Sequence, residues 1–163
     1  MMARYNAWAN GKLYDACAGA GAEAWAADAG LFFQSLRGTL NHLVVADRIW
    51  MRRLTGEGET HAALDEVPYP QFAELRDVRT ALDKRIRTYV EGLHGEALAG
   101  TFTYTPVTDP TPVTQARAPV LAHLFNHQTH HRGQCHAALT RLVGEAPALD
   151  LIYFQRAERL GEA

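Results

Sequence analysis

The stretch HLFNHQTHHRGQ, residues 123–134, decides the fold because it combines helical apolar spacing with a histidine at every fourth position. Residues four apart on an α-helix lie on one face, one turn above each other, with Cβ atoms ~6 Å apart. Two imidazoles in that relation can bind one metal ion, and the spacing occurs as His123/His127 and as His127/His131. A rise of about 1.5 Å per residue separates His123 from His131 by roughly 12 Å, so only one pair can share an ion.

The apolar stripe of the same segment indicates which of the two histidine pairs faces the core. The stripe consists of Leu121, Leu124, Phe125, Cys135, Leu139 and Leu142. On a helical wheel of ~100° per residue, His131 lies nearest this stripe, His127 next and His123 furthest toward solvent. A third ligand should come from a facing helix, and His42 is the only histidine inside another segment that we predict to be a long helix. Three neutral imidazoles leave a coordination position open. Surface or core histidines can share this spacing, so the spacing alone leaves metal binding open.

Apolar residues three or four apart predict four long helices. They cover residues 2–18, 31–54, 72–93 and 119–143. Alternating β-branched and aromatic residues at 101–105 and the shorter run 112–114 predict a hairpin, and a last short helix covers residues 149–160. We therefore predict an all-α four-helix bundle, one domain over residues 1–163, with a hairpin-like excursion before the last long helix.

The composition argues against several classes of protein. A net charge of −2 over 163 residues leaves no basic face for nucleic acid. No apolar run approaches the ~18–20 residues of a membrane span, and the N-terminus does not resemble a signal peptide. Two cysteines, Cys17 and Cys135, cannot form a disulfide framework and suit a reducing compartment. We expect a cytoplasmic protein.

Four motifs together resemble the DinB/YfiT-like family. They are residues 36–50 (LRGTLNHLVVADRIW), 123–134, 4–10 (RYNAWAN) and 147–150 (PALD), in the order that the family shows. The resemblance implies a four-helix bundle, often dimeric, with a histidine triad that corresponds to His42, His127 and His131. It also implies one divalent metal ion, with zinc or nickel the leading candidates. Some relatives are enzymes that use bacillithiol or mycothiol, and many others have no assigned reaction.

Three functions are compatible with this sequence. We favour a metal- and thiol-dependent S-transferase, in which a low-molecular-weight thiol attacks an electrophile and Arg132 orients a carboxylate on either molecule. A hydrolase using the same site is a variant of this hypothesis. The alternatives are a non-catalytic metal-binding stress-response protein and a helical interaction module without metal. For Arg132 itself, we prefer a role in a polar network between helices, since a buried arginine needs partners.

The remaining polar residues receive structural interpretations. Asp47 should make a structural hydrogen bond or pair with Arg48 or Arg132. Cys135, four residues after His131, is either an extra soft ligand or, as we prefer, a buried small apolar residue like Cys17. Asp150 should be the N-cap of the last helix. His123 has no assigned role beyond a position at the rim of the site or hydrogen-bonded to a ligand. His130 and His136 should be exposed or interfacial, and His61 and His94, in predicted loops, should be uninvolved. Trp8, Trp50 and Gln128 are candidates for the surface of a homodimer.

Overall fold

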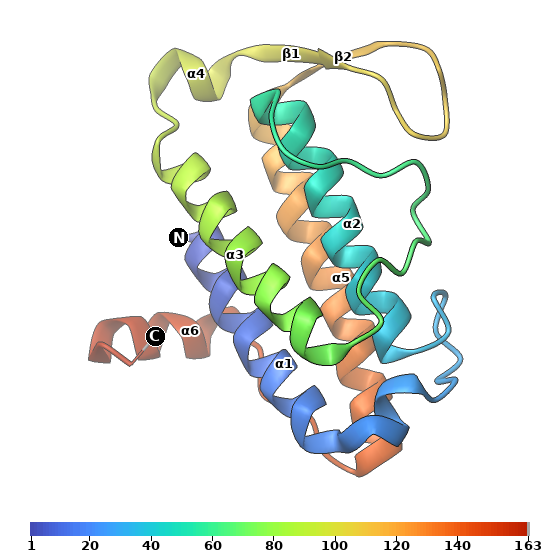
Figure 1. Cartoon of the computed structure of the whole chain (residues 1–163). Helices are drawn as coiled ribbons and strands as arrows, with labels where there is room; N and C mark the ends of the chain where they lie inside the picture. The colour runs from blue at the N-terminus through green and yellow to red at the C-terminus, as the bar shows by residue number, and fades with distance from the viewer. Residues whose placement is uncertain (163) are drawn as a thin grey trace.

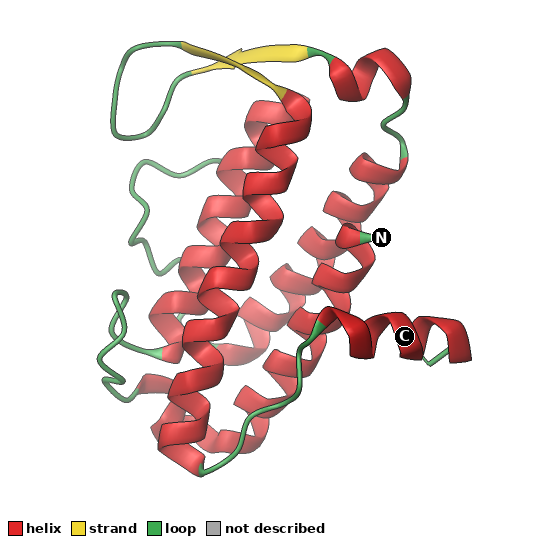
Figure 2. Ribbon diagram, turned by 180° about the vertical axis from the view of Figure 1, so that it is seen from behind, coloured by secondary structure: helices red, strands yellow, loops and turns green. Residues whose placement is uncertain are grey.

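A computed structural model describes residues 1–162 as a bundle of four long helices, which confirms the predicted all-α class (Figure 1). These helices are α1 (Met2–Ala26), α2 (Leu36–Thr55), α3 (Phe72–Glu91) and α5 (Arg117–Val143). The shorter elements are α4 (Gly95–Ala99), β1 (Thr101–Tyr104), β2 (Val113–Ala116) and α6 (Leu151–Leu160). The hairpin lies across one end of the bundle and α6 projects from its side (Figure 2). No helix within residues 1–162 is long and apolar enough to cross a membrane.

Helices α2 and α3 run in the same direction, although they follow each other in the chain. Asn41, near the start of α2, exchanges two 2.9 Å hydrogen bonds with the backbone of Tyr69, just before α3. Arg85, near the end of α3, donates to the hydroxyl of Thr55 at the end of α2. The connection of residues 56–71 must therefore run back along the bundle before α3 begins (Figure 1). Helices α1 and α5 both run the opposite way (Figure 1). Helices α3 and α5 each pack against both α1 and α2, and α1 and α2 also contact each other across the bundle.

The predicted apolar stripes form one main core and contribute to two smaller buried clusters, one that contains Tyr5 and one that contains Leu121. Leu13, Leu40, Leu75, Leu124 and Leu139, drawn from all four long helices, belong to a single cluster and are almost fully buried. Burial of a leucine side chain stabilises a fold by about 1.5–3 kcal/mol. Periodicity therefore identified the faces on which the bundle is built.

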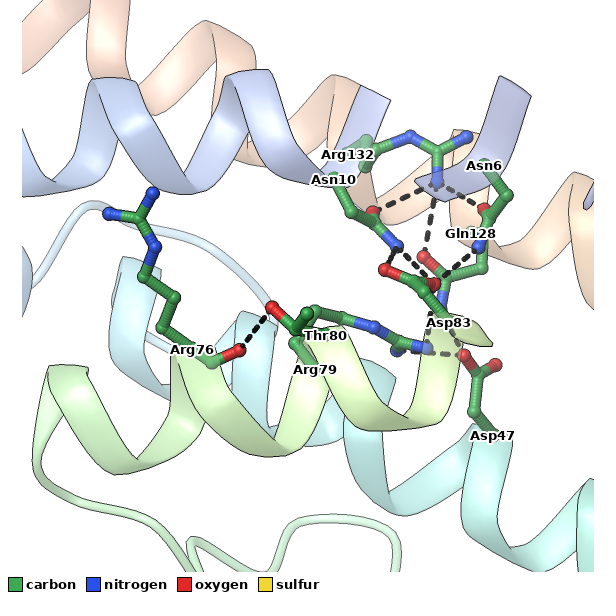
Figure 3. Close-up of polar contacts among 9 residues, drawn as sticks. All are labelled: Asn6, Asn10, Asp47, Arg76, Arg79, Thr80, Asp83, Gln128 and Arg132. Carbon is green, nitrogen blue, oxygen red and sulfur yellow. Dashed lines mark hydrogen bonds and ion pairs between the residues drawn. The ribbon is translucent and has the colours of Figure 1, made fainter. Parts of the chain in front are cut away.

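A layer of buried polar side chains crosses this core (Figure 3). Arg79 of α3 donates to Asp47 of α2 at 2.8 Å and pairs with Asp83 at 2.9 Å. Asp83 in turn accepts hydrogen bonds from Asn6 and Asn10 of α1. Each buried charge thus has a partner, without which its burial would be costly.

Arg132 of α5 completes the layer, as the network interpretation predicted. Its guanidinium donates to the side-chain oxygens of Asn6, Asn10 and Gln128, and Gln128 donates to Asp47. The structural hydrogen bond that we favoured for Asp47 is therefore present. The alternative, an ion pair with Arg48 or Arg132, is wrong, because Arg48 pairs with Glu59 and Arg132 donates to neutral side chains. Gln128 is fully buried, so its assignment to a dimer surface is also wrong.

Helix boundaries differ from the predicted ones where local chemistry outweighs periodicity. Helix α1 continues past Ala18 to Ala26 because the segment is rich in alanine, with a break at Gly21, whose φ of 83° suits glycine. Helix α2 begins five residues later than predicted, since Ser35 accepts a hydrogen bond from the backbone of Gly38 and caps it. The predicted hairpin is confirmed, with Thr101 opposite Ala116. Asp150 precedes α6 as predicted, but its side chain makes no capping hydrogen bond.

Candidate metal centre

The three histidines expected to form a triad lie together. His42 comes from α2, and His127 and His131 come from successive turns of α5. One ring nitrogen from each lies within 4.8 Å of the other two, and the Nε2 atoms of His42 and His127 are 3.1 Å apart. Two nitrogens on one tetrahedral zinc ion, each bound at about 2.0–2.1 Å, are roughly 3.4 Å apart. Within residues 1–162, no other group of three histidine, cysteine or acidic side chains is close enough to hold a metal ion.

Two carbonyl groups fix the orientation of the ligand rings. The backbone carbonyl of Leu64 lies 2.8 Å from Nδ1 of His42, and Oε1 of Gln134 lies 2.7 Å from Nδ1 of His131. Carbonyl oxygens can only accept, so both Nδ1 atoms carry the proton. The Nε2 lone pairs of these two rings are therefore free for a metal ion. A ligating histidine almost always has such a partner on its other nitrogen.

Phe33 holds the His42 ring in place, and Gly38 makes room for the backbone of Phe33. The Phe33 ring stacks on the His42 imidazole, with centroids 3.9 Å apart and planes 17° apart. The backbone of Phe33 passes directly over α2 at Gly38, where a Cβ atom would collide with the Phe33 carbonyl. Glycine at this position therefore permits the close approach that brings Phe33 over the ring.

The site keeps its imidazoles neutral. Burial lowers the pKa of His42 to about 4, a shift opposed by the Leu64 carbonyl and reinforced by His131. Burial and the neighbouring rings of His131 and His42 lower the pKa of His127 to about 3. Burial also lowers the pKa of His131. At neutral pH all three are unprotonated, which is the form that binds metal ions.

The donor set fits a late first-row transition ion. Three imidazoles suit zinc, nickel or copper, whereas magnesium and calcium require oxygen ligands. With three protein ligands, a four-coordinate ion keeps one position for another molecule. The residues present therefore fit the divalent ion that the family resemblance implies.

A cavity of about 300 Å³ opens beside His42 and His127. Its walls come from the face of α2 that carries His42 and from the hairpin and the loop between its strands. The lining residues are His42, Ala46, Ile49, Trp50, Arg53, Leu64, Tyr104, Pro106, Val107, Thr108, His123 and His127. This volume matches the lower end of small-molecule sites. The triad is thus accessible to a small ligand from one side.

Other predicted residues lie outside the triad. His123 is exposed at the rim of the cavity, its ring 5.4 Å from that of Trp50. Arg132 is held in the buried polar layer and does not line this cavity. Cys135 is fully buried in the core with Cys17, and burial raises the pKa of both thiols, that of Cys17 to about 12. Both cysteines are therefore the buried apolar residues that we preferred.

Sequence reasoning missed Arg53. It lies eleven residues after His42, and eleven residues are close to three turns of helix, so the same wheel that favoured the triad places Arg53 on the face of His42. It also missed Phe33, which lies in a turn that we predicted as the start of a helix, and the Leu64 carbonyl, which lies in a connection without periodicity. It gave no role to Gln134, although Gln134 lies in a quoted motif.

Comparison with models of known protein families shows the family of this chain. The model of the DinB family matches residues 1–161. The chain belongs to the DinB family. No curated protein and no solved structure gives a match. The match to the DinB model covers both helices that supply the triad, and it confirms the resemblance first seen in residues 36–50 and 123–134.

Proposed function

We propose that this DinB protein binds one divalent metal ion, zinc or nickel, through His42, His127 and His131, and that it is a transferase using a low-molecular-weight thiol. One observation carries the proposal. The three histidines converge beside a cavity of about 300 Å³, while Leu64 and Gln134 direct two of the ring nitrogens inward.

The chemistry follows from the ligand set and the cavity. His42, His127 and His131 would hold the divalent ion, whose charge would lower the pKa of a thiol in the cavity, so that the thiol would lose its proton to solvent at neutral pH. The transfer would join the thiol sulfur to an electrophilic carbon of the second substrate, and the leaving group would depart with the electron pair of the broken bond. Trp50 and Tyr104 line the cavity and offer aromatic surface to the apolar part of either molecule.

Elemental analysis of the protein without a histidine tag tests the metal site. We expect about one divalent ion per chain in the wild type, and loss of that ion in His127→Ala. His136→Ala is the matched control, because His136 lies on the same helix outside the triad. Little metal in the wild-type protein after resupply would refute the metal site.

Thiol use needs a second measurement on metal-loaded protein. We expect faster consumption of an electrophile such as monobromobimane with small thiols in the wild type than in His127→Ala. Full metal occupancy without any acceleration would favour the non-catalytic metal-binding protein, and hydrolysis of the electrophile without thiol would favour the hydrolase.

Both cysteines are free thiols, which suits a reducing compartment, and we place this activity in the cytoplasm. The expected homodimer stays a prediction, which light scattering can check.

A further inference from the structure

Among the described residues 1–162, Arg53 is the one permanently charged side chain that lines the cavity beside the triad. It lies in the last turn of α2 and is partly buried. Its guanidinium carbon is 4.7 Å from the ring centre of Trp50 and 4.5 Å from that of Tyr104. The two rings therefore fix the guanidinium against the cavity wall through cation–π contacts.

Within residues 1–162, Arg53 makes no ion pair with an acidic side chain. Its single hydrogen bond to the protein in this part of the chain is a 3.0 Å bond from Nη2 to the backbone carbonyl of Thr105. Arg48, one turn earlier on α2, pairs with Glu59. A partly buried guanidinium with several unused N–H donors has lost hydration without gaining a carboxylate.

In the part of the chain that the structure describes, no acidic residue lines the cavity, so an anion that enters it meets no negative side chain. A planar guanidinium binds a carboxylate through two parallel N–H···O bonds. A single cation suits a carboxylate better than a phosphate dianion, which usually has several cationic partners. Apart from Thr108 and the three histidines in the lining, the rest of the wall is apolar or aromatic, notably Ile49, Trp50, Leu64, Pro106 and Val107.

We propose that Arg53 selects substrates bearing a carboxylate next to an apolar group, and binds that carboxylate while the reacting group lies at the triad. This inference rests on the proposed function and adds the substrate class to it. The carboxylate belongs either to the thiol or to the electrophile. Arg53 thereby takes the orienting role that sequence reasoning considered for Arg132.

The test compares ligands that differ only in charge. Binding of 3-phenylpropionate and of 3-phenylpropionamide is measured by calorimetry, on metal-free and on zinc-loaded protein. We expect the wild type to prefer the carboxylate on the order of tenfold in both forms, as for a charge-assisted hydrogen bond at a partly exposed site. Arg53→Gln should abolish the preference in the metal-free form, and Arg53→Lys should retain part of it.

Arg52→Gln is the matched control, because Arg52 is exposed in the same turn of α2 and its loss removes the same charge from the helix end. It should keep the full preference. Absence of a preference in the metal-free wild type, or its survival in Arg53→Gln, would overturn the proposal. Equal weakening of both ligands in Arg53→Gln would also overturn it, since Arg53 would then only hold the hairpin at Thr105.

Two thiols then identify which molecule carries the carboxylate. If 3-mercaptopropionate binds the zinc-loaded protein more tightly than 3-mercaptopropanol in an Arg53-dependent way, the thiol carries it. Equal binding of the two thiols, with the phenylpropionate preference intact, assigns it to the electrophile. The zinc content of each sample reports on the triad separately, so a failure of the metal site is distinguishable from a failure of Arg53.

Discussion

Substitution of Gly38 by alanine should destabilise the protein, against the usual effect of alanine in a helix. An added Cβ would lie 3.2 Å from the carbonyl carbon of Phe33 and 3.3 Å from its Cβ, and closer still to its carbonyl oxygen. The Phe33 backbone must therefore move by on the order of 1 Å, and such overpacking costs about 1–3 kcal/mol. The gain in helix propensity is only about 0.5–1 kcal/mol. We expect a net loss of about 1–2 kcal/mol in the free energy of unfolding.

Gly11→Ala is the control, because Gly11 lies in mid-helix in α1 with no atom within 4 Å of an added Cβ. It should stabilise the protein by about 0.5–1 kcal/mol. Urea denaturation of both metal-free variants should show that the free energy of unfolding falls in Gly38→Ala and rises in Gly11→Ala. Because Phe33 stacks on His42, Gly38→Ala should also weaken zinc binding, whereas Gly11→Ala should not. A Gly38→Ala variant as stable as Gly11→Ala would refute this account of the close contact.

Three further predictions concern the polar groups. Arg79→Leu removes the cation between two buried carboxylates and should lower the free energy of unfolding, measured by urea denaturation, by about 3–5 kcal/mol. Arg76→Leu is the control and should lower it by under ~1 kcal/mol, because the ion pair of Arg76 is exposed. Gln134→Leu should weaken zinc affinity by about 10–100-fold in a chelator competition, although Gln134 is not a ligand; unchanged affinity would contradict the orienting role. His42 and His127 have folded-state pKa values of about 4 and 3, below the ordinary 6.5. Between these values and pH 6.5, the unfolded chain therefore binds more protons than the folded chain. Metal-free protein should therefore lose stability as the pH falls below 6.5, and His127→Gln should lose less; a flat pH profile would argue against buried neutral rings.

Periodicity predicted the bundle and the pairing of His127 with His131, since both depend on which residues share a helix face. His42 followed as the only histidine inside another predicted long helix, and the family resemblance implied the full triad. His127 and His131 share a face by their spacing, and His42 lies on the edge of the apolar stripe that α2 turns toward α5. The partners of Asp47 were not predictable in the same way. They depend on α3 lying beside α2, and hence on the path of residues 56–71.

The groups that irregular segments contribute to the site could also not be predicted from the sequence pattern. The Leu64 carbonyl is a backbone atom whose direction no residue type encodes, and Phe33 reaches His42 through a turn at residues 31–34 that periodicity assigned to a helix. Arg53 is different, because its position on the wheel relative to His42 was available from the sequence alone.

The long connection between α2 and α3 has a consequence for how such a site can be tuned. The backbone carbonyl of its residue Leu64 accepts a hydrogen bond from Nδ1 of His42, so the length and course of residues 56–71 set the orientation of that ring at the triad. A shortened or lengthened connection would tilt the ring while every ligand stayed in place. Insertions or deletions in this surface connection would therefore change the direction of the His42 ring nitrogen at the triad without altering a single histidine.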